Sequence, residues 1–122
     1  MRFALVLGMA LMALSPPALA QTASYTWTGF GKSGGVGGSG GKCASYKMKI
    51  DVTVTGTDIK GLFQQEGRVQ RNFEATADAA GVFRTKAKVD GGSMDVKGTI
   101  SATKASVLLD GYCKFDATLK KV

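Results

Sequence analysis

The stretch YKMKIDVTVT, residues 46–55, alternates apolar and polar side chains without interruption. Its apolar positions are Tyr46, Met48, Ile50, Val52 and Val54. Because successive side chains of a β-strand point to opposite faces, a period of two predicts a strand with one buried and one exposed face. No segment of the chain has a comparable helical period, so the stretch indicates an all-β fold.

The same alternation returns four more times toward the C-terminus, and glycine-containing turn signals such as Glu66-Gly67 and Asp110-Gly111 separate the runs. Glycine accepts the positive φ of hairpin turns. Because the connections between the runs are so short, consecutive strands must be antiparallel neighbours. We predict about eight strands, near residues 24–30, 45–55, 58–65, 68–77, 82–89, 93–101, 104–109 and 112–119.

An antiparallel meander of about eight strands with one apolar face can curl and close, which removes its exposed edges. We therefore predict a small up-and-down β-barrel in which the first strand pairs with the last. A β-sandwich satisfies the same pattern and stays open as the alternative.

Residues 1–20 have the features of a cleaved secretory signal. Arg2 precedes an uncharged apolar run, and Ala18-Leu19-Ala20 fits the small-x-small cleavage site. The run has about a dozen residues, fewer than the roughly 20 that span a bilayer. Cleavage leaves residues 21–122 as a single β-domain with 15 basic and 9 acidic residues. We predict a periplasmic or extracellular location.

The chain has two cysteines, Cys43 and Cys113. An exported protein meets an oxidising compartment, where an even number of cysteines predicts a disulfide. CxxC spacing, which would favour redox work, is absent. We therefore predict one Cys43–Cys113 disulfide.

Residues 29–41 contain eight glycines, and we predict that they form a flexible loop. Matches to GxGxxG within this tract are expected by chance in so glycine-rich a segment. The dinucleotide fingerprint also requires a helix after the glycines, and no helix is predicted there.

Catalytic chemistry has little support in the composition. The chain has no histidine, which excludes Ser-His-Asp and Cys-His arrangements. Its nine acidic residues are scattered singly, mostly at turns, so neither a glycosidase pair nor a calcium loop is indicated. We predict that the protein is not an enzyme and uses no metal or cofactor, with a hydrolase as a remote alternative.

The surface positions of the predicted strands are strongly basic. The lysines and arginine expected to point outward are Lys47, Lys49, Arg84, Lys86, Lys88 and Lys97. The simplest interpretation of these basic residues is a solvated barrel exterior that discourages pairing between exposed strand edges. They also predict an anion-binding surface, whereas nucleic acid is disfavoured because few aromatic side chains would face outward.

Arg71 interrupts an apolar face, where a buried arginine is costly unless paired. We therefore name Arg71, with the inward-facing Tyr46 and Phe73, as candidate ligand-binding residues at the barrel mouth.

The order of certain motifs resembles that of small uncharacterised exported β-domains of alphaproteobacteria. The motifs are Trp27, Cys43-Ala44-Ser45-Tyr46, Gly67, Gly81, Gly91-Gly92, Gly98-Thr99-Ile100-Ser101 and the end from Cys113 to Lys120. The architecture is also similar to that of calycins such as lipocalins, avidins and small protease inhibitors. These resemblances imply a β-barrel and assign no site residues.

Together these features predict an exported, non-enzymatic binding module that holds a small apolar or anionic ligand in the barrel mouth. The partner could equally be an anionic component of the cell envelope. The alternative is a protease-inhibitor-like or envelope-structural protein that acts through the glycine-rich end.

Overall fold

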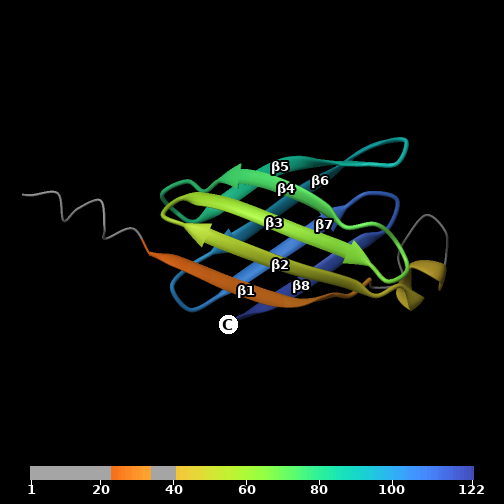
Figure 1. Ribbon diagram of the computed structural model, residues 1–122, viewed down its shortest axis with the longest axis horizontal. Coiled ribbons are helices and arrows are strands. Elements are labelled where there is room, and N and C mark those ends of the chain that lie inside the picture. The colour runs from red at the N-terminus through yellow and green to blue at the C-terminus, as the bar shows by residue number, and fades with distance from the viewer. Residues whose placement is uncertain (1–22, 34–40) are drawn as a thin grey trace, which may run out of the picture.

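The computed structural model describes residues 23–33 and 41–122. The predicted signal peptide and residues 34–40 of the predicted glycine loop lie outside this part. The described chain forms eight strands and one short 3-10 helix (Figure 1). They are β1 (Ser24–Gly31), η2 (Gly41–Ser45), β2 (Met48–Thr55), β3 (Asp58–Gln65), β4 (Arg71–Thr76), β5 (Val82–Val89), β6 (Gly92–Ile100), β7 (Ala105–Asp110) and β8 (Lys114–Lys121).

The strands form one antiparallel sheet in the order β4-β3-β2-β1-β8-β7-β6-β5. The first strand joins the last, with Trp27 opposite Lys121 and Thr28 opposite Lys120. This pairing curls the meander into a nearly closed barrel, with β1 to β4 on one side and β5 to β8 on the other (Figure 1). The predicted all-β meander, with its first strand paired to its last, is confirmed, and the barrel is nearly closed.

The two ends of the sheet, β4 and β5, lie next to each other along a seam at the top of Figure 1. Among the described residues no ladder of hydrogen bonds joins them, so side chains close the barrel here. The Phe73 and Phe83 rings stack with their centroids 6.2 Å apart and their planes 13° apart. Each ring also lies over a glycine of its neighbouring strand, Phe73 over Gly61 and Phe83 over Gly98.

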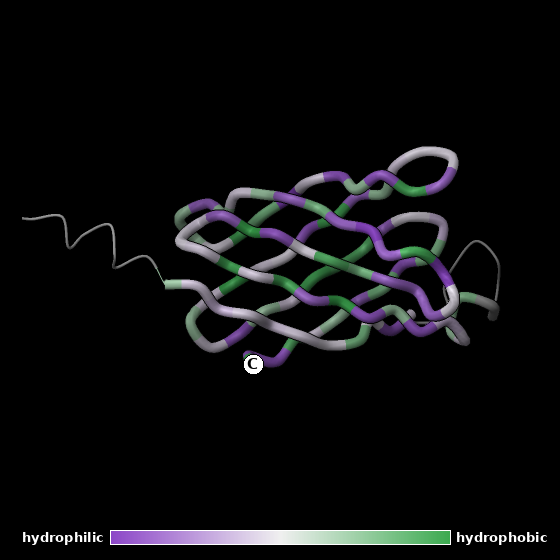
Figure 2. Tube along the Cα trace, in the orientation of Figure 1, coloured by the Kyte–Doolittle hydropathy of each residue, from purple (hydrophilic) through white to green (hydrophobic). Residues whose placement is uncertain are grey.

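The barrel interior is packed with apolar side chains from all eight strands. Figure 2 shows the alternation of hydrophobic and hydrophilic residues along the strands that produces this core. The largest side chains with almost no exposure are Phe83, Phe115, Ile50, Ile59 and Leu109. In the described part of the chain no polar or charged side chain is fully buried. The barrel is therefore filled along most of its length.

The glycine-rich loop predicted over residues 29–41 begins later than expected, because β1 continues through Gly31 and Gly41 already belongs to η2. Glycine serves here to bring β1 close to β8. A Cβ at Gly29 would lie 2.9 Å from Leu119 Cδ2, and a Cβ at Gly31 would lie 2.9 Å from Phe115 Cβ. The loop prediction was wrong for residues 29–31, of which the predicted strand near 24–30 already included the first two, because it treated glycine only as a source of flexibility.

The predicted disulfide is present. Cys43 in η2 and Cys113, just before β8, form a bond that links residues 70 positions apart. It ties the connection between β1 and β2 to the connection between β7 and β8. Within residues 23–33 and 41–122, no helix has the length and apolar character needed to cross a membrane.

Candidate ligand-binding site

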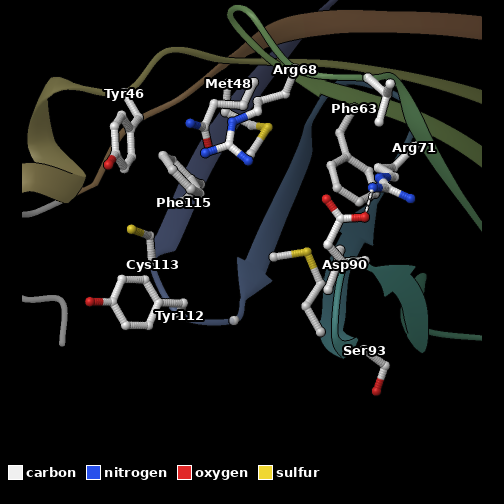
Figure 3. Close-up of a pocket in the computed structure, with 15 residues that line it drawn as sticks. Tyr46, Met48, Phe63, Arg68, Arg71, Asp90, Ser93, Tyr112, Cys113 and Phe115 are labelled. Carbon is white, nitrogen blue, oxygen red and sulfur yellow. Dashed lines mark hydrogen bonds and ion pairs between the residues drawn. The ribbon is translucent and has the colours of Figure 1, made fainter. Parts of the chain in front are cut away.

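A pocket of about 380 Å³ opens at one end of the barrel (Figure 3). Its walls come from the strand ends and connections that meet there. The lining residues are Tyr46, Met48, Phe63, Gln65, Arg68, Val69, Arg71, Val89, Asp90, Ser93, Met94, Gly111, Tyr112, Cys113 and Phe115. A volume of this size lies in the range of pockets that hold small organic ligands.

The floor of the pocket is apolar and continuous with the core. Met48, Phe63 and Phe115 point inward from β2, β3 and β8, and each is almost completely buried. Met94 of β6 adds a second thioether at 9% exposure. Methionine and phenylalanine side chains present an adaptable, polarisable surface, which suits an apolar ligand group of irregular shape.

One wall of the pocket carries an ion pair across the seam. Arg71 begins β4 and Asp90 follows β5, and the Arg71 Nη2 atom lies 2.5 Å from Asp90 Oδ1 (Figure 3). The Arg71 side chain is 29% exposed, whereas that of Asp90 is 82% exposed. The pair therefore lies at the rim. Asp90 neutralises the charge of Arg71 there, and the ion pair connects β4 with the end of β5, two strands that no hydrogen-bonded ladder joins.

A second arginine, Arg68, extends from the connection between β3 and β4 toward the pocket (Figure 3). Its backbone is held on both sides. The Arg68 N–H donates to the Gln65 carbonyl at 2.9 Å, and the Arg68 carbonyl accepts from Gln64 Nε2 at 2.7 Å. Among the described residues no carboxylate forms an ion pair with Arg68. Arg68 is exposed, and its guanidinium is a positive charge without a carboxylate partner in this part of the chain, beside an apolar floor.

The disulfide builds the opposite wall. It joins η2, which leads into Tyr46, to the turn that contains Tyr112, and Figure 3 shows both tyrosines with Cys113 on this side. Tyr46 is partly buried against the core, while Tyr112 is 74% exposed. Tyrosine combines an apolar ring with a polar hydroxyl, so this wall offers both contact area and hydrogen bonding to a ligand.

The structure brings two of the three predicted ligand-binding residues together. Tyr46 and Arg71 both line the pocket, on opposite sides. Phe73 does not line it, because its ring turns into the seam between Phe63 and Phe83 and is 2% exposed. Phe73 follows the inward register as expected, but it lies two residues deeper along β4 than Arg71.

Most of the lining residues were not singled out from the sequence, and Arg68, Asp90 and Tyr112 are among them. All three belong to connections rather than to the alternating strands on which the prediction concentrated. The order of the strands could have predicted that these residues lie together, because alternate turns of an up-and-down meander lie at the same end of the barrel. Tyr46, Arg68, Asp90 and Tyr112 stand in or beside the first, third, fifth and seventh connections.

The predicted basic residues all lie outside the core, but on two separate walls. Lys47 and Lys49 lie before and within β2, and Lys49 Nζ lies 3.3 Å from Asp51 Oδ2. The others are on the paired strands β5 and β6, namely Arg84, Lys86, Lys88 and Lys97. Because β3 and β4 separate β2 from β5, the expected single basic face is in fact two.

Comparison with known proteins found no matching family model, no matching curated protein and no matching solved structure. These comparisons therefore support neither the resemblance to alphaproteobacterial domains nor the resemblance to calycins. What the structure itself shows is an all-β, nearly closed barrel of eight strands with one disulfide. Within the described part of the chain, no three His, Cys, Asp or Glu residues gather as a metal ion would require.

Proposed function

We propose that this protein is an exported, non-enzymatic binding protein that holds a small amphipathic anion in the pocket at the end of the barrel. The apolar part of the ligand rests on Met48, Phe63 and Phe115, and its anionic group meets Arg68. The disulfide and the signal-like N-terminus support a periplasmic or extracellular location, because disulfides persist in oxidising compartments.

The observation that carries this proposal is the unpaired Arg68 guanidinium beside an apolar floor. Arginine donates up to five hydrogen bonds in a planar fork that matches the geometry of a carboxylate. The neighbouring Arg71 already has a carboxylate partner in Asp90. A ligand with one anionic head and a short apolar body therefore satisfies both parts of the pocket.

We expect the disulfide-bonded protein to bind octanoate at least about tenfold more tightly than octanol, which has the same chain length without the charge. A hydrogen bond to a charged group contributes about 1.5–3 kcal/mol, and 1.4 kcal/mol corresponds to a factor of ten. Arg68→Gln should abolish this preference while leaving octanol binding unchanged. Isothermal titration calorimetry with both ligands measures the effect.

Two variants control this experiment. Arg68→Lys keeps the positive charge and should retain part of the preference for octanoate. Arg84→Gln removes a positive charge from β5, away from the pocket, and should leave both affinities unchanged. An equal loss of octanoate binding in Arg84→Gln and Arg68→Gln would show that net charge, rather than the pocket, attracts the anion.

We expect Asp90→Asn to strengthen octanoate binding by a few-fold. The substitution removes the carboxylate that neutralises Arg71, so a second guanidinium becomes available at the rim. Because Asp90 is highly exposed, the free energy of unfolding should fall by less than about 1 kcal/mol. Calorimetry gives the affinity and chemical denaturation the stability. Weaker octanoate binding in this variant would contradict the assigned role of Arg71.

A second candidate function is docking of a protein partner at the same end, as a protease-inhibitor-like or envelope-structural protein would do. It is supported by Tyr112 and Val69, which are 74% and 63% exposed at the pocket rim. Exposed aromatic residues of this kind are typical anchors of protein interfaces. Failure of the wild-type protein to bind either octanoate or octanol would favour this second candidate.

A further inference from the structure

The outer face of β5 and β6 carries a row of positive charges that is separate from the pocket. Arg84, Lys86 and Lys88 occupy alternate positions of β5 and are exposed. Alternate residues of a strand lie about 7 Å apart on the same face. Lys97 joins them from β6, where it stands directly opposite Arg84. These four residues are called the β5–β6 strip below.

The strip places like charges opposite each other, an arrangement that destabilises a sheet. Arg84 faces Lys97 in the register of β5 and β6, and no carboxylate in the described part of the chain forms an ion pair with either residue. Lys88 faces the uncharged Ser93. A solvated exterior built only for solubility does not need this juxtaposition, since mixed charges serve that purpose better.

One carboxylate, Asp95, belongs to the same face. Lys86 Nζ lies 2.6 Å from Asp95 Oδ1. The hydrogen bond from Lys86 and the charge of Lys86 lower the pKa of Asp95, against a small opposing effect of burial, and the charges of Lys97 and Arg84 lower it further. The carboxylate of Asp95 therefore lies within the positive field of the strip and neutralises only one of its four cations.

The shape and composition of the strip narrow the class of partner. Three cations follow one strand at alternate positions, so the complementary ligand is a linear polyanion rather than a compact ion. The exposed aromatic side chains Tyr25, Phe30 and Tyr112 all lie on other elements, and Val82 is the one large exposed hydrophobic residue on β5 or β6. The strip thus offers neither a platform for stacking bases nor side chains that would insert into lipid.

We propose that the β5–β6 strip binds a linear acidic polysaccharide whose carboxylates follow the row from Arg84 to Lys88, with Lys97 beside it. This function is independent of the pocket, since none of the four residues lines it. Binding is electrostatic and therefore falls as the salt concentration rises.

The test uses immobilised polygalacturonate, which carries one carboxylate per sugar, with neutral dextran as the reference. The disulfide-bonded protein should bind polygalacturonate and not dextran. The double variant Arg84→Glu/Lys97→Glu should bind at least tenfold more weakly. The control variant Lys104→Glu/Lys120→Glu has the same net charge but alters exposed residues of the β6–β7 connection and β8, so its binding should stay within about threefold.

Two further variants separate binding from folding. Asp95→Asn removes the carboxylate that pairs with Lys86 and should strengthen binding by a few-fold. Arg84→Thr removes the charge opposite Lys97, so it should raise Tm by about 2–4 °C while weakening binding. Loss of binding together with a higher Tm cannot result from misfolding.

Three outcomes would overturn the proposal. One is an equal loss of binding in the two double variants, because that would make the attraction a property of net charge. Another is tighter binding of single-stranded DNA than of polygalacturonate. The last is tighter binding of vesicles that contain anionic phospholipid than of polygalacturonate. Preference for DNA or for vesicles would assign the strip to a different class of partner.

Discussion

Replacing Cys43 and Cys113 together with alanine is expected to lower the free energy of unfolding by roughly 4 kcal/mol. The bond closes a loop between residues 70 positions apart. Cross-linking a loop of this length lowers the entropy of the unfolded chain, which corresponds to about this free energy at 25 °C. A domain of this size has a total stability of only about 5–15 kcal/mol, so the effect is large. Urea denaturation of the oxidised wild type and the double variant measures the difference.

Reduction of the wild type supplies the control, because it opens the same loop without changing any side chain. The reduced wild type and the alanine variant should have similar midpoints of unfolding. The variant should also lose octanoate binding, since the bond fixes η2 and the turn that carries Tyr112 beside the pocket. A change in stability below about 1 kcal/mol would show that pairing of β1 with β8 holds this end without the disulfide.

Gly61→Ala is expected to destabilise the protein by about 2–3 kcal/mol, at the upper end of the usual cost of overpacking a core. A Cβ at Gly61 would lie 2.1 Å from Cζ of Phe73, inside the volume of its ring. The ring has little room to move, because it packs between Phe63 and Phe83 with centroids 6.2 Å from each. Since Phe73 closes the seam, displacing it also disturbs the contact between β4 and β5. Chemical denaturation provides the measurement.

A double-mutant cycle isolates this contact. The three atoms nearest to the Cβ that Gly61→Ala would add all belong to the Phe73 ring, so Phe73→Leu should relieve the clash. The double variant should lose at least about 1 kcal/mol less than the sum of the two single variants. Gly98→Ala offers the contrast. Its Cβ would lie 2.3 Å from the backbone oxygen of Ser106, so shortening Phe83 should not rescue it. Additive effects at Gly61 and Phe73 would contradict this account of the seam.

Much of the fold follows from the sequence because its determinants are local. The alternation in residues 46–55 and the turn glycines define strands and hairpins through φ preferences and burial, which act over a few residues. Closure followed from the number of strands and the cost of exposed edges. The start of the glycine-rich loop did not follow, because the need for glycine at positions 29 and 31 of β1 depends on Leu119 and Phe115, more than 80 residues away in the chain.

The candidate site was only partly predictable, for a related reason. Arg71 and Tyr46 stand out because they interrupt or continue an apolar face, and the structure places both at the pocket. Arg68 and Asp90 belong to turns, where charged residues are ordinary and carry no sequence signal of their own. Asp90 matters because it pairs with Arg71, and Arg68 matters because no carboxylate among the described residues forms an ion pair with it. Pairing of this kind depends on tertiary structure.

The most direct test of the proposed pocket is a titration of the ¹⁵N-labelled, disulfide-bonded protein with octanoate, followed by NMR. The account predicts that the largest amide shifts gather at the pocket end, around Tyr46, Met48, Arg68, Met94 and Tyr112. The opposite end, at the β2–β3 and β4–β5 turns, should not change. Shifts centred on the β5–β6 strip, or no shifts at a saturating concentration of octanoate, would contradict the assignment of the pocket as the ligand site.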